Sequence, residues 1–206
     1  MKAMQFKNTR EIMIYAQKYI HGKAMDLGAG SGKYRDIIKK EAAEYVAFDM
    51  APGKHIDVVG DALNISFPNE TFDTVVSTQV LEHVEKPWIM VKEIGRVLKS
   101  GGICILTAPF LEPFHQNPGD FFRYSAQGIQ SLFKNENFEV IECSTCGRLF
   151  SVISEFFRFL WFDPFQKSKK GSYLATRLMA AVSNFLDKAV KNNIIYSDVY
   201  IIAKKK

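Results

Sequence analysis

Short apolar runs alternate with amphipathic stretches along most of the chain, and this alternation predicts an α/β fold. Apolar runs typical of strands begin at Ala24–Leu27 and continue at Tyr45–Met50, Ile56–Asp61, Phe72–Gln79, Ile103–Ala108, Phe138–Cys146 and Asp198–Ala203. Helical patterns are predicted for Asn8–Ile20, Ser31–Lys40, the segment ending at Glu93–Ser100, and Ser125–Lys134. Strands and helices in this order favour a parallel sheet with right-handed crossovers.

The link between the second and third strands is unusually short. Only residues 51–55 separate Met50 from Ile56, whereas a parallel crossover usually takes a dozen or more residues. Because Pro52 and Gly53 oppose a helix in this link, we expect an extended or turn-like connection.

An aromatic-rich insertion, residues 147–197, separates the sixth and seventh strands. The pattern predicts two helices, Leu149–Phe165 and Tyr173–Val190, joined by a turn at Lys167–Gly171. Three roles stay open for this insertion. It can be a hairpin packed on the sheet or against a second copy of the chain, an apolar cap over a ligand pocket, or an amphipathic element on a membrane.

The composition is that of a single globular domain spanning residues 1–206. The chain is 47% hydrophobic and 24% charged, and its net charge of +5 is modest. Part of that charge lies in two lysine clusters, Lys167–Lys170 and Lys204–Lys206. No basic stripe with interleaved aromatic residues accompanies the apolar runs, so we expect no nucleic-acid partner.

Three cysteines provide no disulfide framework, which suits a reducing cytoplasm. Cys143 and Cys146 form a lone C-x-x-C at the end of a predicted strand, where residues three apart point to opposite faces. We therefore expect packing roles for both thiols and no metal site in the chain. The N-terminus does not resemble a signal peptide, and no apolar run is long enough to cross a membrane.

A glycine-rich turn follows the first predicted strand. Gly28, Gly30 and Gly32 allow the backbone to approach a ligand where a Cβ would block it. The turn opens onto a predicted helix N-terminus, where free N–H groups favour an anion such as a carboxylate. The spacing is G-x-G-x-G, and Lys33 stands where a dinucleotide-binding fingerprint requires glycine.

The order of these motifs resembles the class I S-adenosylmethionine (SAM) dependent methyltransferases, most closely the group called type 11. The resemblance covers about Lys23–Phe138 and resumes at the last strand; its motifs are Ala24–Gly32, Tyr45–Met50, Gly60–Ala62, Val80–Val84 and Glu93–Gly102. It implies a Rossmann-like, doubly wound sheet of seven strands, the last antiparallel, with the helical insertion between strands six and seven. It also implies SAM as the cofactor.

The resemblance assigns roles to several of these residues. The amides of Gly30–Gly32 would meet the SAM carboxylate, Asp26 the ammonium group, Asp49 the ribose, and Asp61 with Ala62 the adenine. Thr78 and Gln79 would line the space near the sulfonium. The expected cofactor-binding residues are Asp26, Gly28, Ala29, Gly30, Gly32, Asp49, Met50, Asp61, Ala62, Thr78 and Gln79.

The loop after the fifth strand contains the candidate catalytic residues. Residues Pro113–Tyr124 resemble a P-x-H-x-x-P-x-D-[FY]-x-R-[FY] pattern found in many type 11 proteins. His115, Asp120 and Tyr124 are the candidates for a general base. Alternatively, Asp120 and Arg123 pair and pin the loop. His83 is a further candidate, although a place at a helix start near the cofactor is the favoured interpretation.

These features favour a transferase that moves a methyl group to a small-molecule, saccharide-linked or lipid-linked acceptor. A non-catalytic scaffold or membrane-docked partner protein with this fold is the alternative, and Lys33 argues against a nicotinamide-dependent oxidoreductase. Ser77–Val80 replaces the Asn/Asp-Pro-Pro-Tyr/Phe motif of amino-methylating enzymes. We expect a cytoplasmic protein, with peripheral membrane contact through residues 149–165 or a homodimer as further options.

Overall fold

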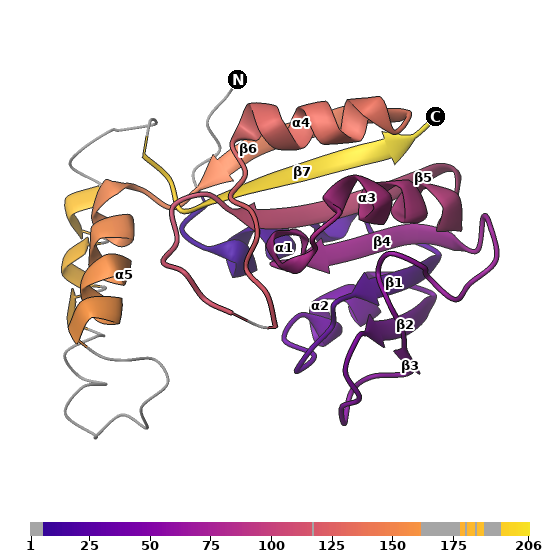
Figure 1. Ribbon diagram of the computed structural model, residues 1–206, viewed down its shortest axis with the longest axis horizontal. Helices are drawn as coiled ribbons and strands as arrows, with labels where there is room; N and C mark the ends of the chain where they lie inside the picture. Colours follow the sequence, from indigo (N-terminus) through magenta and orange to yellow (C-terminus); the bar gives the residue numbers. More distant parts are fainter. Residues whose placement is uncertain (1–5, 117, 162–177, 180, 184, 188–194) are drawn as a thin grey trace.

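The computed structural model describes residues 6–116, 118–161, 178–179, 181–183, 185–187 and 195–206 (Figure 1). Within them, seven strands form one sheet in the order β3-β2-β1-β4-β5-β7-β6. The strands are β1 (Lys23–Leu27), β2 (Glu44–Asp49), β3 (Val58–Val59), β4 (Phe72–Thr78), β5 (Leu98–Pro109), β6 (Phe138–Cys146) and β7 (Asp198–Lys205). The first five strands pair in parallel, whereas β7 runs antiparallel to both β5 and β6. The predicted fold class is confirmed.

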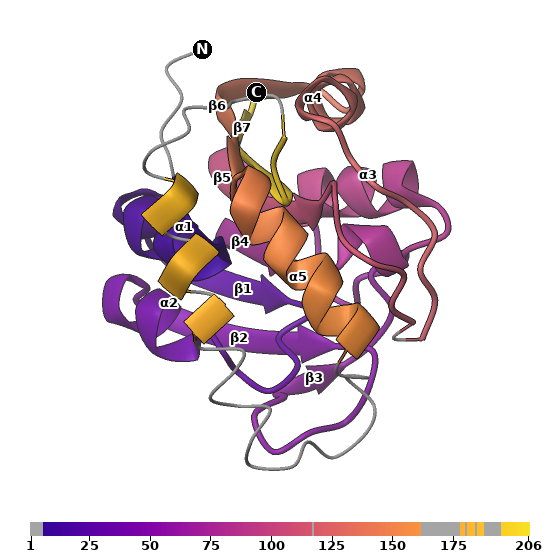
Figure 2. The same ribbon diagram turned by 90° about the vertical axis from the view of Figure 1, so that its left-hand side faces the viewer.

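Helices cover both faces of the sheet. They are α1 (Thr9–Ala16), α2 (Arg35–Glu41), α3 (Pro87–Val97), α4 (Ala126–Asn135) and α5 (Leu149–Trp161), with two 3-10 turns at η1 (Gln17–Tyr19) and η2 (Leu81–His83). Figure 2 shows α1 and α2 on one side of the sheet and α3 and α4 on the other. This three-layer arrangement is the doubly wound one that the alternation of elements predicts.

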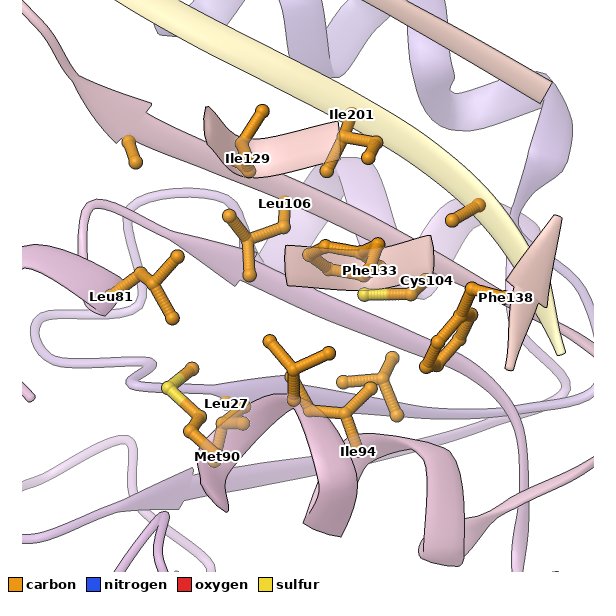
Figure 3. Close-up of a cluster of buried hydrophobic side chains, with 14 of the residues drawn as sticks. Leu27, Leu81, Met90, Ile94, Cys104, Leu106, Ile129, Phe133, Phe138 and Ile201 are labelled. Carbon is orange, nitrogen blue, oxygen red and sulfur yellow. The ribbon is translucent and has the colours of Figure 1, made fainter. Parts of the chain in front are cut away.

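Two apolar clusters lie on opposite faces of the sheet. One is formed by α3, α4 and strand residues such as Leu106 and Ile201 (Figure 3). The other joins α1 and α2 to the far face of the sheet. Cys143 belongs to the first cluster and Cys146 to the second, and both thiols are free and buried. The predicted packing of this pair on opposite faces is therefore confirmed.

Local sequence signals fix several helix starts. The side chain of Asn8 accepts a hydrogen bond from the Glu11 amide at the start of α1, and Ser125 does the same for the Gly128 amide at the start of α4. Proline occupies the first turn of α3, where its missing N–H costs nothing. These caps explain why the predicted starts of α1 and α4 agree with the structure.

Three predicted boundaries are wrong. The helix expected from Ser31 begins at Arg35, because residues 31–34 form turns. The strand expected at Ile56–Asp61 contains only Val58–Val59. Its start is lost because the Asp57 side chain, rather than a ladder carbonyl, accepts from the Ala47 amide at 2.8 Å. The strand expected from Ile103 begins at Leu98, so Gly101 and Gly102 lie within β5.

The link at residues 51–55 contains no helix, as predicted, and β2 and β3 still pair in parallel. Gly60 follows β3 and lies over the ring of Phe48, because a Cβ built on it would stand 2.5 Å from Cζ of that ring. This close approach holds the short third strand against the second and brings the ends of both strands to one edge of the sheet.

Helix α5 lies beyond the carboxyl ends of the parallel strands, and short helical segments at 178–179, 181–183 and 185–187 lie beside it (Figures 1 and 2). The Asp187 carboxylate accepts from the amides of Phe150 and Ser151 at 2.9 and 3.0 Å, which caps the start of α5. The predicted turn at 167–171 lies outside the described residues. Among the residues that are described, no helix is long and apolar enough to span a membrane.

Candidate functional site

A cavity of about 510 Å³ opens at the carboxyl ends of β1, β2 and β4. The sheet order reverses between β1 and β4, and ligands of doubly wound folds bind at such a switch point. The cavity is lined by Leu27, Gly28, Phe48, Asp49, Met50, Ala51, Gly60, Asp61, Ala62, Leu63, Gln79, Val80, His83, Val84, Glu85, Pro118 and Phe121. Its wall is mainly apolar and includes several carboxylates.

The glycine turn brings backbone to the wall of this cavity. Gly28 has a φ of +80°, and a Cβ built on it would stand 2.2 Å from Cγ2 of Val80. The amides of Gly28 and Ala29 donate to the Phe48 carbonyl at 2.8 and 3.2 Å, which ties the turn to β2. Only glycine allows this close packing of the turn against the segment after β4.

Asp49 organises the turn and faces the cavity at the same time. One carboxylate oxygen accepts from the Gly30 amide at 2.8 Å, and the other accepts from the Ala51 amide at 3.0 Å. Each carboxylate oxygen has a second lone pair, so the group can still accept hydrogen bonds from a ligand. A fixed carboxylate at the end of the second strand is well suited to a pair of ribose hydroxyls.

Asp26 lies beneath the turn and is only 2% exposed. Burial raises the pKa of its carboxyl to about 6, and the charge of Asp49 adds to this effect, while a hydrogen bond from the Tyr45 hydroxyl opposes it. This bond measures 3.0 Å. Ionised Asp26 is therefore a buried anion with one donor, which favours a nearby cation.

The segments after β3 and β4 provide the remaining polar groups of the wall. The Asp61 carboxylate accepts from the Leu63 amide at 2.8 Å. Gln79 has a φ of +55°, and its side-chain amide donates to Thr107 Oγ1 at 3.2 Å and to Asp198 Oδ1 at 3.1 Å. These two bonds fix Gln79 in place at the point where β4 ends.

The cavity collects six of the eleven expected cofactor-binding residues, namely Gly28, Asp49, Met50, Asp61, Ala62 and Gln79. The other five do not line it, namely Asp26, Ala29, Gly30, Gly32 and Thr78. Their assigned roles stay predictions. The apolar wall contributed by Val80, Val84 and Phe121 was not predicted from the sequence. The position of Val80 and Val84 directly after the fourth apolar run was the available signal.

The loop after β5 is pinned by an ion pair. Arg123 donates to both oxygens of Asp120 and to the carbonyls of Glu112 and Pro113. Arg123 is the main cause that lowers the pKa of Asp120 to about 2, although burial opposes it. Asp120 also accepts from the His115 amide at 2.8 Å. The alternative expectation, that Asp120 and Arg123 pair and pin the loop, therefore agrees with the structure. A carboxylate with so low a pKa is a poor base.

Tyr124 is buried, and its hydroxyl donates to the Leu81 carbonyl at 3.3 Å. Burial raises its pKa further above the ordinary value, so its hydroxyl holds its proton firmly. His115 differs from both other candidates, because its ring is partly exposed at 26%. Of the three predicted bases, His115 is the one that the geometry leaves able to accept a proton.

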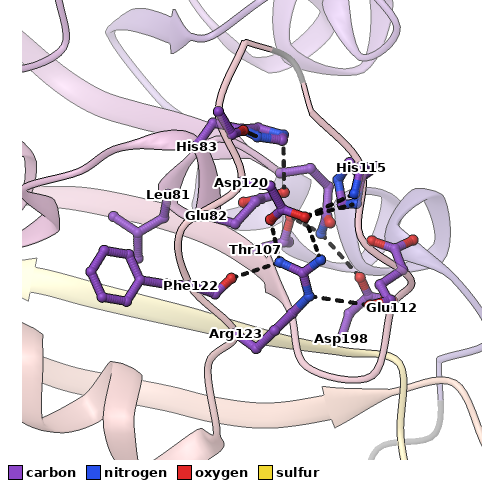
Figure 4. Close-up of polar contacts among 12 residues, drawn as sticks. Leu81, Glu82, His83, Thr107, Glu112, His115, Asp120, Phe122, Arg123 and Asp198 are labelled. Atoms are coloured by element: carbon purple, nitrogen blue, oxygen red, sulfur yellow. Dashed lines mark hydrogen bonds and ion pairs between the residues drawn. The ribbon is translucent and has the colours of Figure 1, made fainter.

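Glu82, His83 and His115 meet next to this loop (Figure 4). Glu82 Oε1 lies 3.7 Å from His83 Nε2, and the two imidazole rings meet edge-on with centroids 5.1 Å apart. The side chain of Glu82 is 0% exposed, and burial raises the pKa of its carboxyl to about 8. The sequence analysis missed Glu82 as a site residue, because only its position beside His83 marked it.

Residues 25–106 match the family model described as a methyltransferase domain. The rice (Oryza sativa subsp. japonica) 2-methyl-6-phytyl-1,4-hydroquinone methyltransferase 1 is 34% identical over 110 residues, which cover 46% of this chain and 33% of that protein. The match covers 33% of the rice protein and 41% of an uncharacterized methyltransferase of Mycobacterium tuberculosis (strain ATCC 25177 / H37Ra), so the chain spans less than half the length of these relatives.

Two solved structures show how widely the fold is shared. The phosphoethanolamine N-methyltransferase 2 of Haemonchus contortus, solved in complex with SAM, superposes with a TM-score of 0.60 at 16% identity and covers 95% of this chain and 52% of that one. The 4+2 cyclase SpnF superposes with a TM-score of 0.66 at 16% identity, covering 95% and 80%. At such identities the likeness establishes the fold alone.

Proposed function

We propose that this chain, whose residues 25–106 match a methyltransferase domain, is a class I SAM-dependent methyltransferase and transfers a methyl group from SAM to a lipid-linked acceptor. The observation that carries the methyl transfer is the cavity at the switch point, where a glycine turn and the carboxylate of Asp49 share one wall. The acceptor class rests on separate observations.

The residues around the cavity fit SAM. The closely packed turn at Gly28 leaves backbone rather than side chain at the wall, as a cofactor held by its polar groups requires. Asp49 would hold the ribose, Asp61 the adenine, and buried Asp26 the ammonium group. The apolar side chains of the wall would pack against the flat base.

SAM supplies, when bound, a methyl group already activated by the sulfonium. The chain must then hold the acceptor in line with that group and exclude water. The fixed side chain of Gln79 and the ring of His83 would orient a polar acceptor, and both residues line the cavity. Phe121 lines the same cavity from the loop after β5, where its apolar side chain would exclude water.

Two observations support a lipid-linked acceptor over a free small molecule or a saccharide. The insertion carries apolar side chains at its surface, with Phe156 42% and Phe157 45% exposed in α5, and Phe185 71% exposed beside it. The relative from rice is named for a hydroquinone that bears a phytyl chain. Peripheral contact between residues 149–161 and a membrane would bring such an acceptor to the cavity.

The same fold also occurs in the 4+2 cyclase SpnF. A non-catalytic or membrane-docked protein therefore stays the competing proposal. The test is to incubate the protein with SAM and either an organic-solvent extract or an aqueous extract of cells, and to measure S-adenosylhomocysteine by mass spectrometry. The Asp49→Ala variant serves as the control.

Formation of S-adenosylhomocysteine with the organic extract, strongly reduced in the Asp49→Ala variant, supports the whole proposal. Formation with the aqueous extract only would retain methyl transfer and overturn the lipid-linked acceptor. A protein that binds SAM but forms no product with either extract would overturn methyl transfer and favour the scaffold.

A further inference from the structure

Glu82, His83 and His115 form a compact cluster that the cofactor roles do not use (Figure 4). Glu82 and His83 belong to η2 after β4, and His115 belongs to the loop after β5. One ligand atom from each residue can be chosen so that all three lie within 4.8 Å of one another. Two separate segments of the chain thus bring two imidazoles and one carboxylate together.

The hydrogen bonds of the two histidines fix which ring nitrogen is available. His83 Nδ1 lies 2.5 Å from the Gly119 carbonyl, and His115 Nδ1 lies 3.0 Å from the Pro113 carbonyl. A carbonyl only accepts, so each Nδ1 must carry the hydrogen. In each neutral ring the Nε2 lone pair is then free, and this pattern of Nδ1 bonded to a carbonyl is typical of metal-binding histidines.

The Glu82 carboxylate lies 3.7 Å from His83 Nε2, which is too long for a hydrogen bond. Its side chain is 0% exposed, and no other residue in the described part of the chain donates a hydrogen bond to either oxygen. A buried carboxylate without donors is costly unless a cation compensates it. Arg123, a cation near it, already engages Asp120.

We propose that Glu82, His83 and His115 bind a divalent transition-metal ion such as Zn²⁺. Two imidazole nitrogens and one carboxylate oxygen suit this class of ion, whereas Mg²⁺ and Ca²⁺ prefer oxygen ligands alone. Bonds of about 2.0–2.2 Å at a tetrahedral angle place ligand atoms about 3.3–3.6 Å apart. The observed 3.7 Å between Glu82 and His83 is close to this spacing.

Three protein ligands leave at least one coordination position for water or a substrate atom. His83 also lines the cavity, so the ion would lie at its edge. If the proposed methyl transfer is right, a cation there would stabilise negative charge on an acceptor oxygen and lessen the need for a general base. Metal binding itself does not depend on that function. No metal site was expected from the sequence, and this proposal replaces that expectation.

The test is calorimetric titration of Zn²⁺ into untagged, chelator-treated protein without SAM, with Mg²⁺ titrated in parallel. His115→Ala and Glu82→Gln each remove one ligand. A double variant, His21→Ala with His55→Ala, is the matched control, because it removes the two other histidines of the chain. Circular dichroism checks the fold of every variant. His115 lies in a loop and belongs to neither apolar cluster, so truncating its side chain to Ala leaves both clusters intact.

We expect one Zn²⁺ per chain, no comparable binding of Mg²⁺, and affinity lowered at least about tenfold by each ligand variant while the control is unchanged. Absorption of bound Co²⁺ in the visible range should be lost in His115→Ala. The proposal is overturned if folded wild-type protein binds no Zn²⁺, if His115→Ala binds as well as wild type, or if Mg²⁺ binds equally well.

Discussion

Replacing Asp26 by Asn should stabilise the unliganded protein and weaken SAM binding. The carboxyl is 2% exposed, and its pKa is raised from 3.8 to about 6. Since one pKa unit corresponds to about 1.4 kcal/mol, keeping Asp26 ionised in the folded protein costs about 3 kcal/mol. An Asn at this position cannot ionise, and its amide oxygen can still accept the hydrogen bond from Tyr45.

The sign of the pH dependence follows from the raised pKa of Asp26. Between pH 3.8 and about 6, Asp26 is protonated more in the folded protein than in the unfolded chain. The contribution of protonated Asp26 to the free energy of unfolding is therefore fully present below this window and is lost as pH rises through it. The advantage of Asp26→Asn should therefore be small at about pH 4 and reach about 3 kcal/mol at about pH 7.5.

Urea unfolding at both pH values measures this difference through the free energy of unfolding, and titration with SAM measures the loss of affinity. Asp36→Asn is the matched control, because Asp36 is an exposed acid at the start of α2. The reasoning is refuted if Asp26→Asn gives the same free-energy difference at both pH values, or if it destabilises the protein at about pH 7.5.

Three further substitutions test separate parts of the site. Asp49→Ala should weaken SAM binding by more than about tenfold in a calorimetric titration, and unchanged affinity would reject the ribose assignment. Asp120→Asn should lower the free energy of urea unfolding by about 2 kcal/mol at neutral pH, because the carboxyl pKa is lowered to about 2. That loss should vanish as pH falls through the window from 3.8 to about 2, and a loss that persists there would contradict the ion-pair account. Gly28→Ala should destabilise the protein by about 1–3 kcal/mol more than Gly30→Ala, because only the first places a Cβ against Val80. Its thermal midpoint should therefore be the lower of the two. Equal effects of the two would show that the packing against Val80 is unimportant.

Much of the fold could be predicted from the sequence because strands and helices alternate with clear periods. The positions of α4 and β6 and the opposite faces of Cys143 and Cys146 followed from caps and alternation alone. Boundaries were predicted less well where side chains compete with the backbone. Asp57 replaces a strand hydrogen bond with its own carboxylate, and periodicity does not reveal such a contact.

Some residues of the site could likewise be predicted from the sequence, and others could not. Asp49 and the glycine turn could be located because the acid ends a strand and the turn follows one. The cluster of Glu82 with His115 could not, because the two residues lie on different segments that only the loop after β5 brings together. A motif read along the chain finds neighbours in sequence, whereas this cluster depends on the path of that loop.

The most direct test of the central claim is a calorimetric titration of the purified protein with SAM, with S-adenosylhomocysteine and NADH titrated alongside. We predict that both sulfur ligands bind with micromolar affinity, that NADH does not bind, and that Asp49→Ala weakens SAM binding by more than about tenfold. A folded protein that binds neither sulfur ligand would contradict the assignment of the cavity and the methyl transfer built on it.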